Sequence, residues 1–211
     1  MKRNINKTLL AMGVAACIFL LRSCLKNNKY YVDFSKYKPS MELPLAATNV
    51  NGLVPVPMGV INPTDSFEVV VNVASVNPLN TSETATIGLD TAFLDQYNTQ
   101  QQQATAAAQA AYLAADTSNT VNDPNYPPDY VPYELFPDSL YTINTMNLTV
   151  PAGQREVHAT LIVNARGINT NYQYVLPFTI TQSSLAISSW NHLMLNIQQK
   201  NPYDDNYTNT Y

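Results

Sequence analysis

The chain has 211 residues and a formal net charge of −4 at pH 7, and only 12% of its residues are charged. The negative sign excludes the global attraction on which nucleic-acid binding rests, because basic residues must neutralise phosphates. Its two cysteines supply neither a disulfide framework nor a cysteine-based metal site. Stability must therefore come from an apolar core, which a chain of this length can bury.

Residues 1–23 are predicted to form a lipoprotein signal peptide. Three basic residues within the first seven positions precede an apolar run at 9–21. A membrane-spanning helix needs roughly 20 apolar residues, so this shorter run is typical of a secretory signal. The run ends just before Cys24, and bacterial lipoproteins are cleaved before a cysteine whose thiol carries the lipid. Cys24 is therefore the predicted lipidation site.

Two alternatives stand beside this interpretation. Val14-Ala15-Ala16-Cys17 is the cleaner match by residue type, but cleavage there would leave apolar residues at the new N-terminus. The other alternative is a plain signal peptide or a single-span anchor. Cleavage before Cys24 would remove four basic residues and no acidic one, which takes the net charge from −4 to −8. Residues 24–47 then form a tether.

Strand patterns dominate the region 48–200. In 66–76, Phe67, Val69, Val71 and Val73 alternate onto one face, which is the pattern of a half-buried strand. Pro177 cannot donate to a ladder, so its strand is expected to lie at an edge or to carry a bulge there. Short strands between Gly, Pro and Asn turns indicate an all-β sandwich. The predicted strands are 66–76, 84–89, 146–150, 156–164, 174–181 and 193–197.

One segment breaks the strand pattern. Gln and Ala dominate the sequence that leads to Asp116, and Ala is the best helix former, so a helix is predicted over 99–115. The segment 123–132 is rich in proline and cannot hold regular structure. Together they form a predicted surface insertion at about 99–132, and long insertions in compact domains are usually functional or disordered.

Four stretches carry a family resemblance: LDTAFLDQYN (89–98), YELFPDSLYTINTMNLTVPAGQ (133–154), YVLPFTITQSS (174–184) and NPYDDNYT (201–208). In this order they resemble the N-terminal immunoglobulin-like domain of unknown function of Bacteroidetes surface lipoproteins of the polysaccharide-utilisation type. The resemblance covers roughly residues 48–200.

The resemblance implies an immunoglobulin-like antiparallel β-sandwich and a lipid anchor in the outer membrane, with the protein surface-exposed or facing the periplasm. Members commonly carry a second module downstream, such as a glycan-binding domain or a glycoside hydrolase, and the shared domain brings no catalytic residues. This chain departs from the pattern by its Ala/Gln-rich insertion. Residues 201–211 resemble the entry to a missing second domain.

These observations predict a non-enzymatic, lipid-anchored protein of the cell envelope that binds or displays glycans and uses no cofactor. Its expected partners are the membrane, through the N-terminal lipid, and glycans or other surface lipoproteins, with no nucleic acid. One alternative is a structural spacer in a truncated larger lipoprotein. Another is the stalk of a glycoside hydrolase whose catalytic domain is absent.

Aromatic side chains are the main resource for binding. An exposed ring can stack on the apolar face of a sugar while its polar atom forms a hydrogen bond. Tyr112, Tyr126, Tyr130 and Tyr133 lie in or beside the insertion and are the candidate glycan-stacking residues. The alternative is that such tyrosines pack at strand ends, and Trp190 is expected in the core or at the sandwich edge.

No pattern of catalytic or metal-binding residues stands out. His158 is expected to be a solvated strand residue and His192 a structural one, and two lone histidines are a poor basis for zinc or a nucleophilic triad. Glu134 and Asp138 offer two carboxyls, which a glycosidase needs at a set separation, but turn and surface roles are favoured. No catalytic residue and no metal ligand are predicted.

Overall fold

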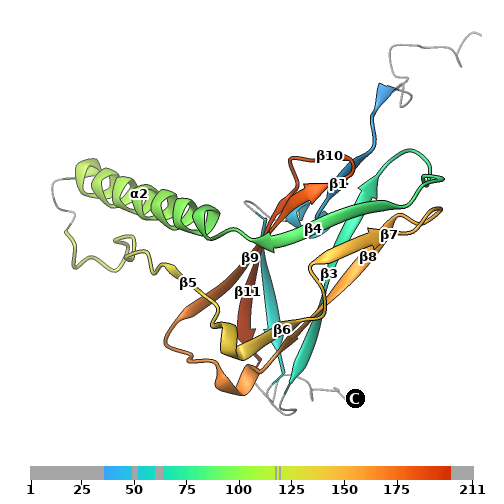
Figure 1. The fold of residues 1–211 in the computed structure, drawn as a ribbon. Helices are drawn as coiled ribbons and strands as arrows, with labels where there is room; N and C mark the ends of the chain where they lie inside the picture. The colour runs from blue at the N-terminus through green and yellow to red at the C-terminus, as the bar shows by residue number, and fades with distance from the viewer. Residues whose placement is uncertain (1–35, 49–51, 60–63, 117, 119, 201–211) are drawn as a thin grey trace, which may run out of the picture. The chain divides into compact units, whose positions relative to one another are not determined.

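The computed structural model describes residues 36–48, 52–59, 64–116, 118 and 120–200. The predicted signal peptide, the predicted lipidation site Cys24 and the segment 201–211 lie outside these residues. The described chain folds into two packed β-sheets with one long helix inserted in the second (Figure 1). The predicted all-β sandwich with a helical insertion is confirmed.

The first sheet centres on a long antiparallel pair, β3 and β8. Eight residues of β3, from Asp65 to Asn72, pair with residues Val163 to Glu156 of β8. The predicted alternation holds in both strands, since Val69 and Val71 are buried in β3 and Leu161 in β8. In sheet order the strands are β10 (Ala186–Ile187), β1 (Ser40–Glu42), β3 (Asp65–Ala74), β8 (Glu156–Val163) and β6 (Tyr141–Ile143).

The second sheet has β9 at its centre. Its order is β2 (Leu53–Met58), β11 (His192–Gln199), β9 (Gln173–Ser183), β4 (Glu83–Leu89) and β7 (Asn147–Val150), and β5 (Tyr133–Leu135) also pairs with β9. Buried side chains of the β3–β8 pair and of the β11–β9–β4 triplet share one core, as the two sheets of an immunoglobulin-like sandwich do. Three pairs, β1–β10, β2–β11 and β5–β9, are parallel. Short 3₁₀ turns cover Pro44–Ala47, Asp138–Leu140 and Ala165–Gly167.

β9 is buried on both of its faces. Leu176, Phe178 and Ile180 point into the main core between the sheets, as the sequence predicts. On the opposite face, Val175 joins Met194 of β11 and Leu94 of the helix in a second, smaller apolar cluster. The helix therefore covers part of the outer face of the second sheet.

The sandwich begins earlier than its predicted boundary at residue 48. β1 starts at Ser40, and both Met41 and Leu43 are fully buried. The predicted tether 24–47 is therefore wrong from residue 40 onward. Because β1 has only three residues, it gives no alternation that a period-two search can detect.

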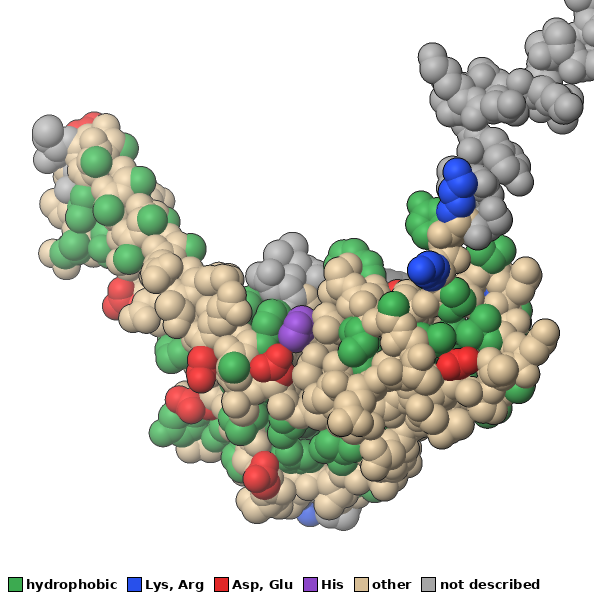
Figure 2. All heavy atoms as spheres, turned by 45° about the horizontal axis from the view of Figure 1, so that its top comes forward, with side chains coloured by type: hydrophobic (Ala, Val, Ile, Leu, Met, Phe, Trp, Pro, Cys, Tyr) green, Lys and Arg blue, Asp and Glu red, His purple; other side chains and the backbone are tan. Residues whose placement is uncertain are grey.

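The helix α2 covers Thr91–Ala115 and so starts eight residues before the predicted start at 99. Asp90 caps it, since its side chain accepts a hydrogen bond from the backbone N–H of Phe93 at 3.0 Å. We call α2 together with the returning segment, residues 120–132, the arm. The arm projects from the sandwich, and its surface shows mainly hydrophobic and uncharged polar groups, with a few Asp side chains and no Lys or Arg (Figures 1 and 2).

β4 ends beside Pro177 of β9, and there the chain leaves the second sheet to enter α2. The expectation of an edge or a bulge at this proline is wrong, because β9 lies between β11 and β4 and the β4–β9 register shifts at Thr86/Ile87 instead. The Pro177 carbonyl accepts a hydrogen bond from the Asp90 N–H at 2.7 Å. Because proline has no backbone N–H, Pro177 cannot donate the reciprocal hydrogen bond to the Asp90 carbonyl. The Asp90 carbonyl instead accepts from the N–H of Leu94 at 3.3 Å, so the ladder ends where the helix begins.

Among the described residues, no helix combines the length and the apolarity that crossing a membrane requires.

Candidate functional site

Asn98 fastens the inner end of the arm. Its Nδ2 donates to the carbonyl of Tyr133 at 2.9 Å, while its Oδ1 accepts from the Tyr133 N–H at 3.0 Å and from the Tyr130 hydroxyl at 2.8 Å. Burial raises the pKa of Tyr130 to about 12, with the charges of Tyr97 and Tyr133 adding to the shift. The hydroxyl of Tyr130 therefore stays protonated and holds the returning segment on α2.

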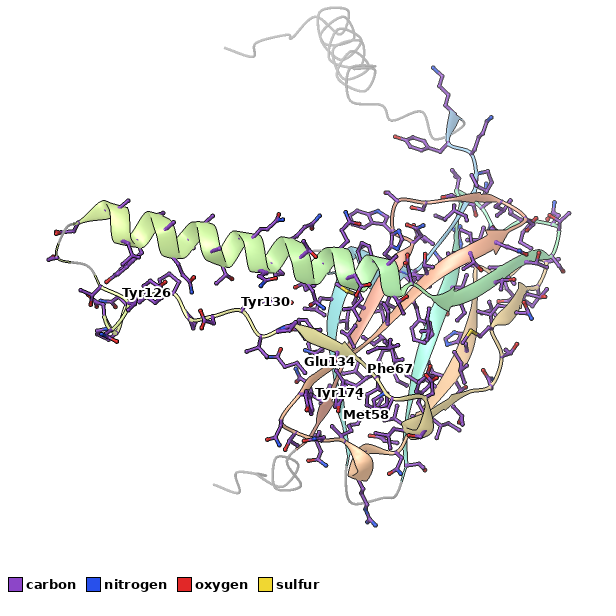
Figure 3. The ribbon with its side chains drawn as sticks, turned by 60° about the vertical axis from the view of Figure 1, so that its left-hand side comes forward. Met58, Phe67, Tyr126, Tyr130, Glu134 and Tyr174 are labelled. Carbon is purple, nitrogen blue, oxygen red and sulfur yellow. The ribbon has the colours of Figure 1, made fainter. Side chains whose placement is uncertain are left out.

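The outer end of the arm is held by different contacts. The rings of Tyr112 and Tyr126 meet edge to face with centroids 6.0 Å apart. Gln109 Nε2 donates to the carbonyl of Pro127 at 3.1 Å and to Asp129 Oδ1 at 2.9 Å. Figure 3 shows Tyr126 and Tyr130 on the segment that runs back beside α2.

The structure divides the four candidate tyrosines into two pairs. Tyr130 and Tyr133 lie at the inner end of the arm, and Tyr112 and Tyr126 at the outer end. All four are partly covered. Each ring or hydroxyl serves to hold the arm together, so the four rings do not form one continuous platform.

A polar recess, which we call the arm cleft, opens between α2 and the returning segment. Its volume is about 380 Å³, and it is lined by Asp95, Asn98, Thr99, Gln102, Tyr130 and Pro132. Of the four candidate tyrosines, only Tyr130 belongs to this lining. The lining of the cleft contains one carboxylate, two carboxamides and two hydroxyls.

A second recess lies beside Trp190, which is 48% exposed and therefore not a core residue. This Trp190 recess has a volume of about 240 Å³ and is lined by Ala46, Gly52, Phe93, Ser189, Trp190 and His192. The backbone at Trp190 is fixed on both sides. Its carbonyl accepts from the Leu43 N–H at 2.8 Å, and its N–H donates to Ser188 Oγ at 3.2 Å.

The floor of the Trp190 recess is a stacked pair of rings. Phe93 and His192 lie 4.4 Å apart between centroids, with 16° between their planes. His192 Nδ1 lies 3.3 Å from Asp90 Oδ2 and makes no well-aligned hydrogen bond. Gly52 has a φ of 66°, and a Cβ there would come within 2.3 Å of the His192 carbonyl, so only glycine fits at this wall.

Sequence reasoning missed the Trp190 recess because its residues come from three distant parts of the chain. The turn before β2, the first turn of α2 and the start of β11 meet there. The sequence signal that could have indicated this recess is Trp190 itself, an aromatic residue just before a strand in a Ser- and Asn-rich turn. The predicted strand 193–197 is confirmed as part of β11, and His192 is the first residue of that strand.

His158 occupies the polar face of β8, as its alternation predicts. Its Nδ1 lies 4.0 Å from Glu68 Oε2 and its Nε2 lies 3.6 Å from Glu156 Oε1, with 46% of its side chain exposed. Both contacts are solvated; the one with Glu68 crosses to β3 and the one with Glu156 runs along β8. Within the described ranges, no group of three or more His, Cys, Asp or Glu residues is placed to hold a metal ion.

Comparison with known proteins places the chain in a family. A protein-family model described as an N-terminal domain matches residues 27–187, most of the chain. No curated protein matches the chain.

Several solved structures from Bacteroides share the fold. A multidomain protein of Bacteroides ovatus that includes a domain of unknown function, DUF1735, has a TM-score of 0.56 at 14% identity, over 79% of this chain and 47% of its own. A second B. ovatus protein of unknown function has a TM-score of 0.54 at 15% identity, over 79% of this chain and 48% of its own. An auxiliary nutrient binding protein of Bacteroides thetaiotaomicron has a TM-score of 0.51 at 14% identity, over 82% of this chain and 49% of its own. This chain spans about half the length of these proteins.

Proposed function

The chain belongs to this family of N-terminal domains, a Bacteroidetes domain of unknown function, and from that premise we propose that it is a non-enzymatic glycan-binding domain. We further propose that a lipid on Cys24 holds it at the outer membrane. A fold alone does not define a function, so the proposal rests on a site.

The Trp190 recess is the observation that carries the proposal. An indole that is half exposed, on a backbone fixed from both sides, offers a flat apolar face to a sugar ring. Beside it, His192 and Ser189 line the recess with polar side chains, and Asp90 lies 3.3 Å from the buried Nδ1 of His192. A concave apolar surface with a few convergent polar groups is the usual form of a small-ligand site.

The composition of both recesses favours binding over hydrolysis. Glycoside hydrolysis requires a pair of carboxyl groups on either side of the scissile bond. The Trp190 recess has one neighbouring carboxylate, Asp90, which already caps α2. The arm cleft also holds a single carboxylate, Asp95.

Two further observations support an accessory role at the envelope. One structure that shares the fold is named an auxiliary nutrient binding protein, and its chain is about twice as long as the part matched here. The N-terminal sequence, a basic start and a short apolar run before Cys24, has the form of a lipoprotein signal.

A structural spacer is the second candidate function. It is favoured by the coverage, because the chain accounts for only about half of the solved structures it matches. In a spacer, neither recess would bind a ligand, and removing Trp190 would change nothing beyond local packing.

Native affinity electrophoresis of residues 25–211 tests the proposal. Gels would contain uncharged polysaccharides, namely mannan, glucan, galactan and xylan. We expect one of them to retard the domain, and Trp190→Ala to abolish the retardation. The matched control is Tyr172→Ala, which removes a ring that is 52% exposed and lies outside both recesses. Equal retardation of both variants would remove the Trp190 recess from the proposal, and no retardation of the wild type would favour the spacer.

A further inference from the structure

The arm cleft lies on a different flank of α2 from the Trp190 recess. Asp95, Asn98, Thr99 and Gln102 follow the i, i+3, i+4, i+7 spacing and so form one stripe along the helix. Leu94 and Tyr97 belong to another flank, which packs on the second sheet. The first three turns of α2 thus border both recesses.

The walls of the arm cleft are fixed before any ligand arrives. Tyr130 is anchored through its hydroxyl to Asn98, and Asn98 is itself bound to both backbone groups of Tyr133. Thr99 Oγ1 donates to the carbonyl of Asp95 at 2.8 Å. A wall held in this way loses little conformational freedom when a ligand binds.

Two planar polar groups remain for a ligand. No hydrogen bond joins the carboxylate of Asp95 or the carboxamide of Gln102 to another described residue, and both residues are exposed. They are seven residues apart, which places them about 10 Å apart along the helix axis. One sugar ring with hydroxyl groups at both edges fits between them, with the ring of Tyr130 as the adjoining wall.

The charge around the cleft selects against anions. The arm, residues 91–115 and 120–132, carries three Asp residues and no Lys or Arg. Acidic side chains gather where the arm joins the sandwich, with one His beside them and no Lys or Arg among them on the face in Figure 2. The summed field of such a surface repels an anionic ligand such as a uronate or a sulfated sugar.

We propose that the arm cleft is a second saccharide-binding site, for an uncharged pyranose, with Asp95 and Gln102 as its hydrogen-bonding residues. The proposal rests on the proposed function in one respect: both recesses take sugars of the same uncharged polysaccharide. When two weak sites engage one polymer, the second binding event becomes intramolecular, so the loss of either site weakens the apparent affinity.

The test compares Trp190→Ala, Asp95→Ala/Gln102→Ala and Gln103→Ala by affinity electrophoresis. The gels contain the uncharged polysaccharide that retards the wild type most. We expect Asp95→Ala/Gln102→Ala to weaken the apparent affinity about tenfold, because two hydrogen bonds to the ligand are lost. Gln103→Ala is the matched control, since this residue is exposed on the same helix but does not line the cleft. It should bind as the wild type does. Thermal unfolding of each variant, monitored by circular dichroism, checks that the fold is retained.

The outcomes separate the two proposals. If Trp190→Ala loses binding and Asp95→Ala/Gln102→Ala does not, the arm cleft is overturned and the proposed function stands. If only Asp95→Ala/Gln102→Ala loses binding, the arm cleft is supported and the Trp190 recess is not the site. Equal retention by the same polysaccharide after carboxymethylation would overturn the selection for uncharged sugars. No retention of the wild type by any uncharged polysaccharide would overturn both.

Discussion

Asp90 and His192 join the start of the helix to the start of the last strand. Asp90 Oδ1 accepts from the N–H of Phe93 at 3.0 Å, and Asp90 Oδ2 lies 3.3 Å from His192 Nδ1. One carboxylate therefore serves as the cap of α2 and as the neighbour of the histidine in the Trp190 recess. Both the arm and the recess depend on where this side chain lies.

Asp90→Ala is expected to lower the free energy of unfolding by about 1 kcal/mol, because the helix loses its capping side chain. Asp90→Asn should lower it less, since Asn caps helices about as well as Asp and loses only the negative charge beside His192. Urea denaturation of the two variants and the wild type checks the order. Equal destabilisation by Ala and Asn would show that the charge, not the cap, is what stabilises this junction.

Leu94→Ala should be among the most damaging changes in the arm. Leu94 is 4% exposed and packs against Val175 and Met194, so its truncation opens a cavity under the helix. We expect a loss of about 2–5 kcal/mol in the free energy of unfolding.

The control for that change is Leu113→Ala, the same substitution on the same helix at a residue that is 38% exposed. Its effect should stay within about 0.5 kcal/mol. Denaturant unfolding curves of the two variants and the wild type measure both losses in the free energy of unfolding. If both lose little, the second apolar cluster does not hold the arm on the sheet.

Asn98→Ala should release the returning segment without unfolding the sandwich. The substitution removes three hydrogen bonds to Tyr130 and Tyr133. We expect hydrogen exchange in residues 120–132 to accelerate by about 5- to 150-fold, since the loss of such bonds is worth about 1–3 kcal/mol.

The neighbouring exposed residue supplies the control for Asn98→Ala. Thr99→Ala removes only a hydroxyl that donates to its own helix, at the carbonyl of Asp95. Exchange in residues 120–132 should then stay near the wild-type rate. Unchanged exchange in Asn98→Ala would mean that the contacts of Tyr112 and Gln109 are sufficient to hold the segment.

The arm should loosen at high pH. Burial raises the pKa of Tyr130 to about 12 in the folded protein, above the ordinary value of about 10. The stability contributed by its neutral form is therefore complete below pH 10 and is lost as the pH rises from there through 12. Burial also raises the pKa values of Tyr97 and Tyr133, so tyrosinate absorbance should show a late transition to which several tyrosines contribute. Its amplitude should fall by the share of one tyrosine in Tyr130→Phe and stay unchanged in Tyr172→Phe. An undiminished late transition in Tyr130→Phe would assign it to the other tyrosines alone.

Sequence reasoning succeeded where one face of an element is buried over many residues. β3 and β8 are long and half-buried, so Val69, Val71 and Leu161 appear as a strict alternation. It failed for β1, β5, β6 and β10, which have two or three residues each and so contain at most one and a half periods of the alternation. Their positions follow from tertiary pairing with longer strands.

The start of α2 and the Trp190 recess were missed for a different reason. The segment 91–98 is rich in aromatic and polar residues and has no marked helix propensity. It becomes helical because Asp90 caps it and Leu94 packs on β9 and β11. The recess depends on long-range contacts of Gly52, Phe93 and Trp190, and a single sequence contains no pattern that connects them.

The arm begins and ends on the same strand. The Asp90 N–H reaches the carbonyl of Pro177, and the Phe136 N–H reaches the carbonyl of Val175, so the two attachment points lie only two residues apart along β9. The length of the arm is therefore independent of the register of the sheets, and lengthening a loop adds closure entropy only with the logarithm of its length. This junction is a natural graft point: segments of other lengths and chemistries can be exchanged there while the sandwich that carries them stays the same.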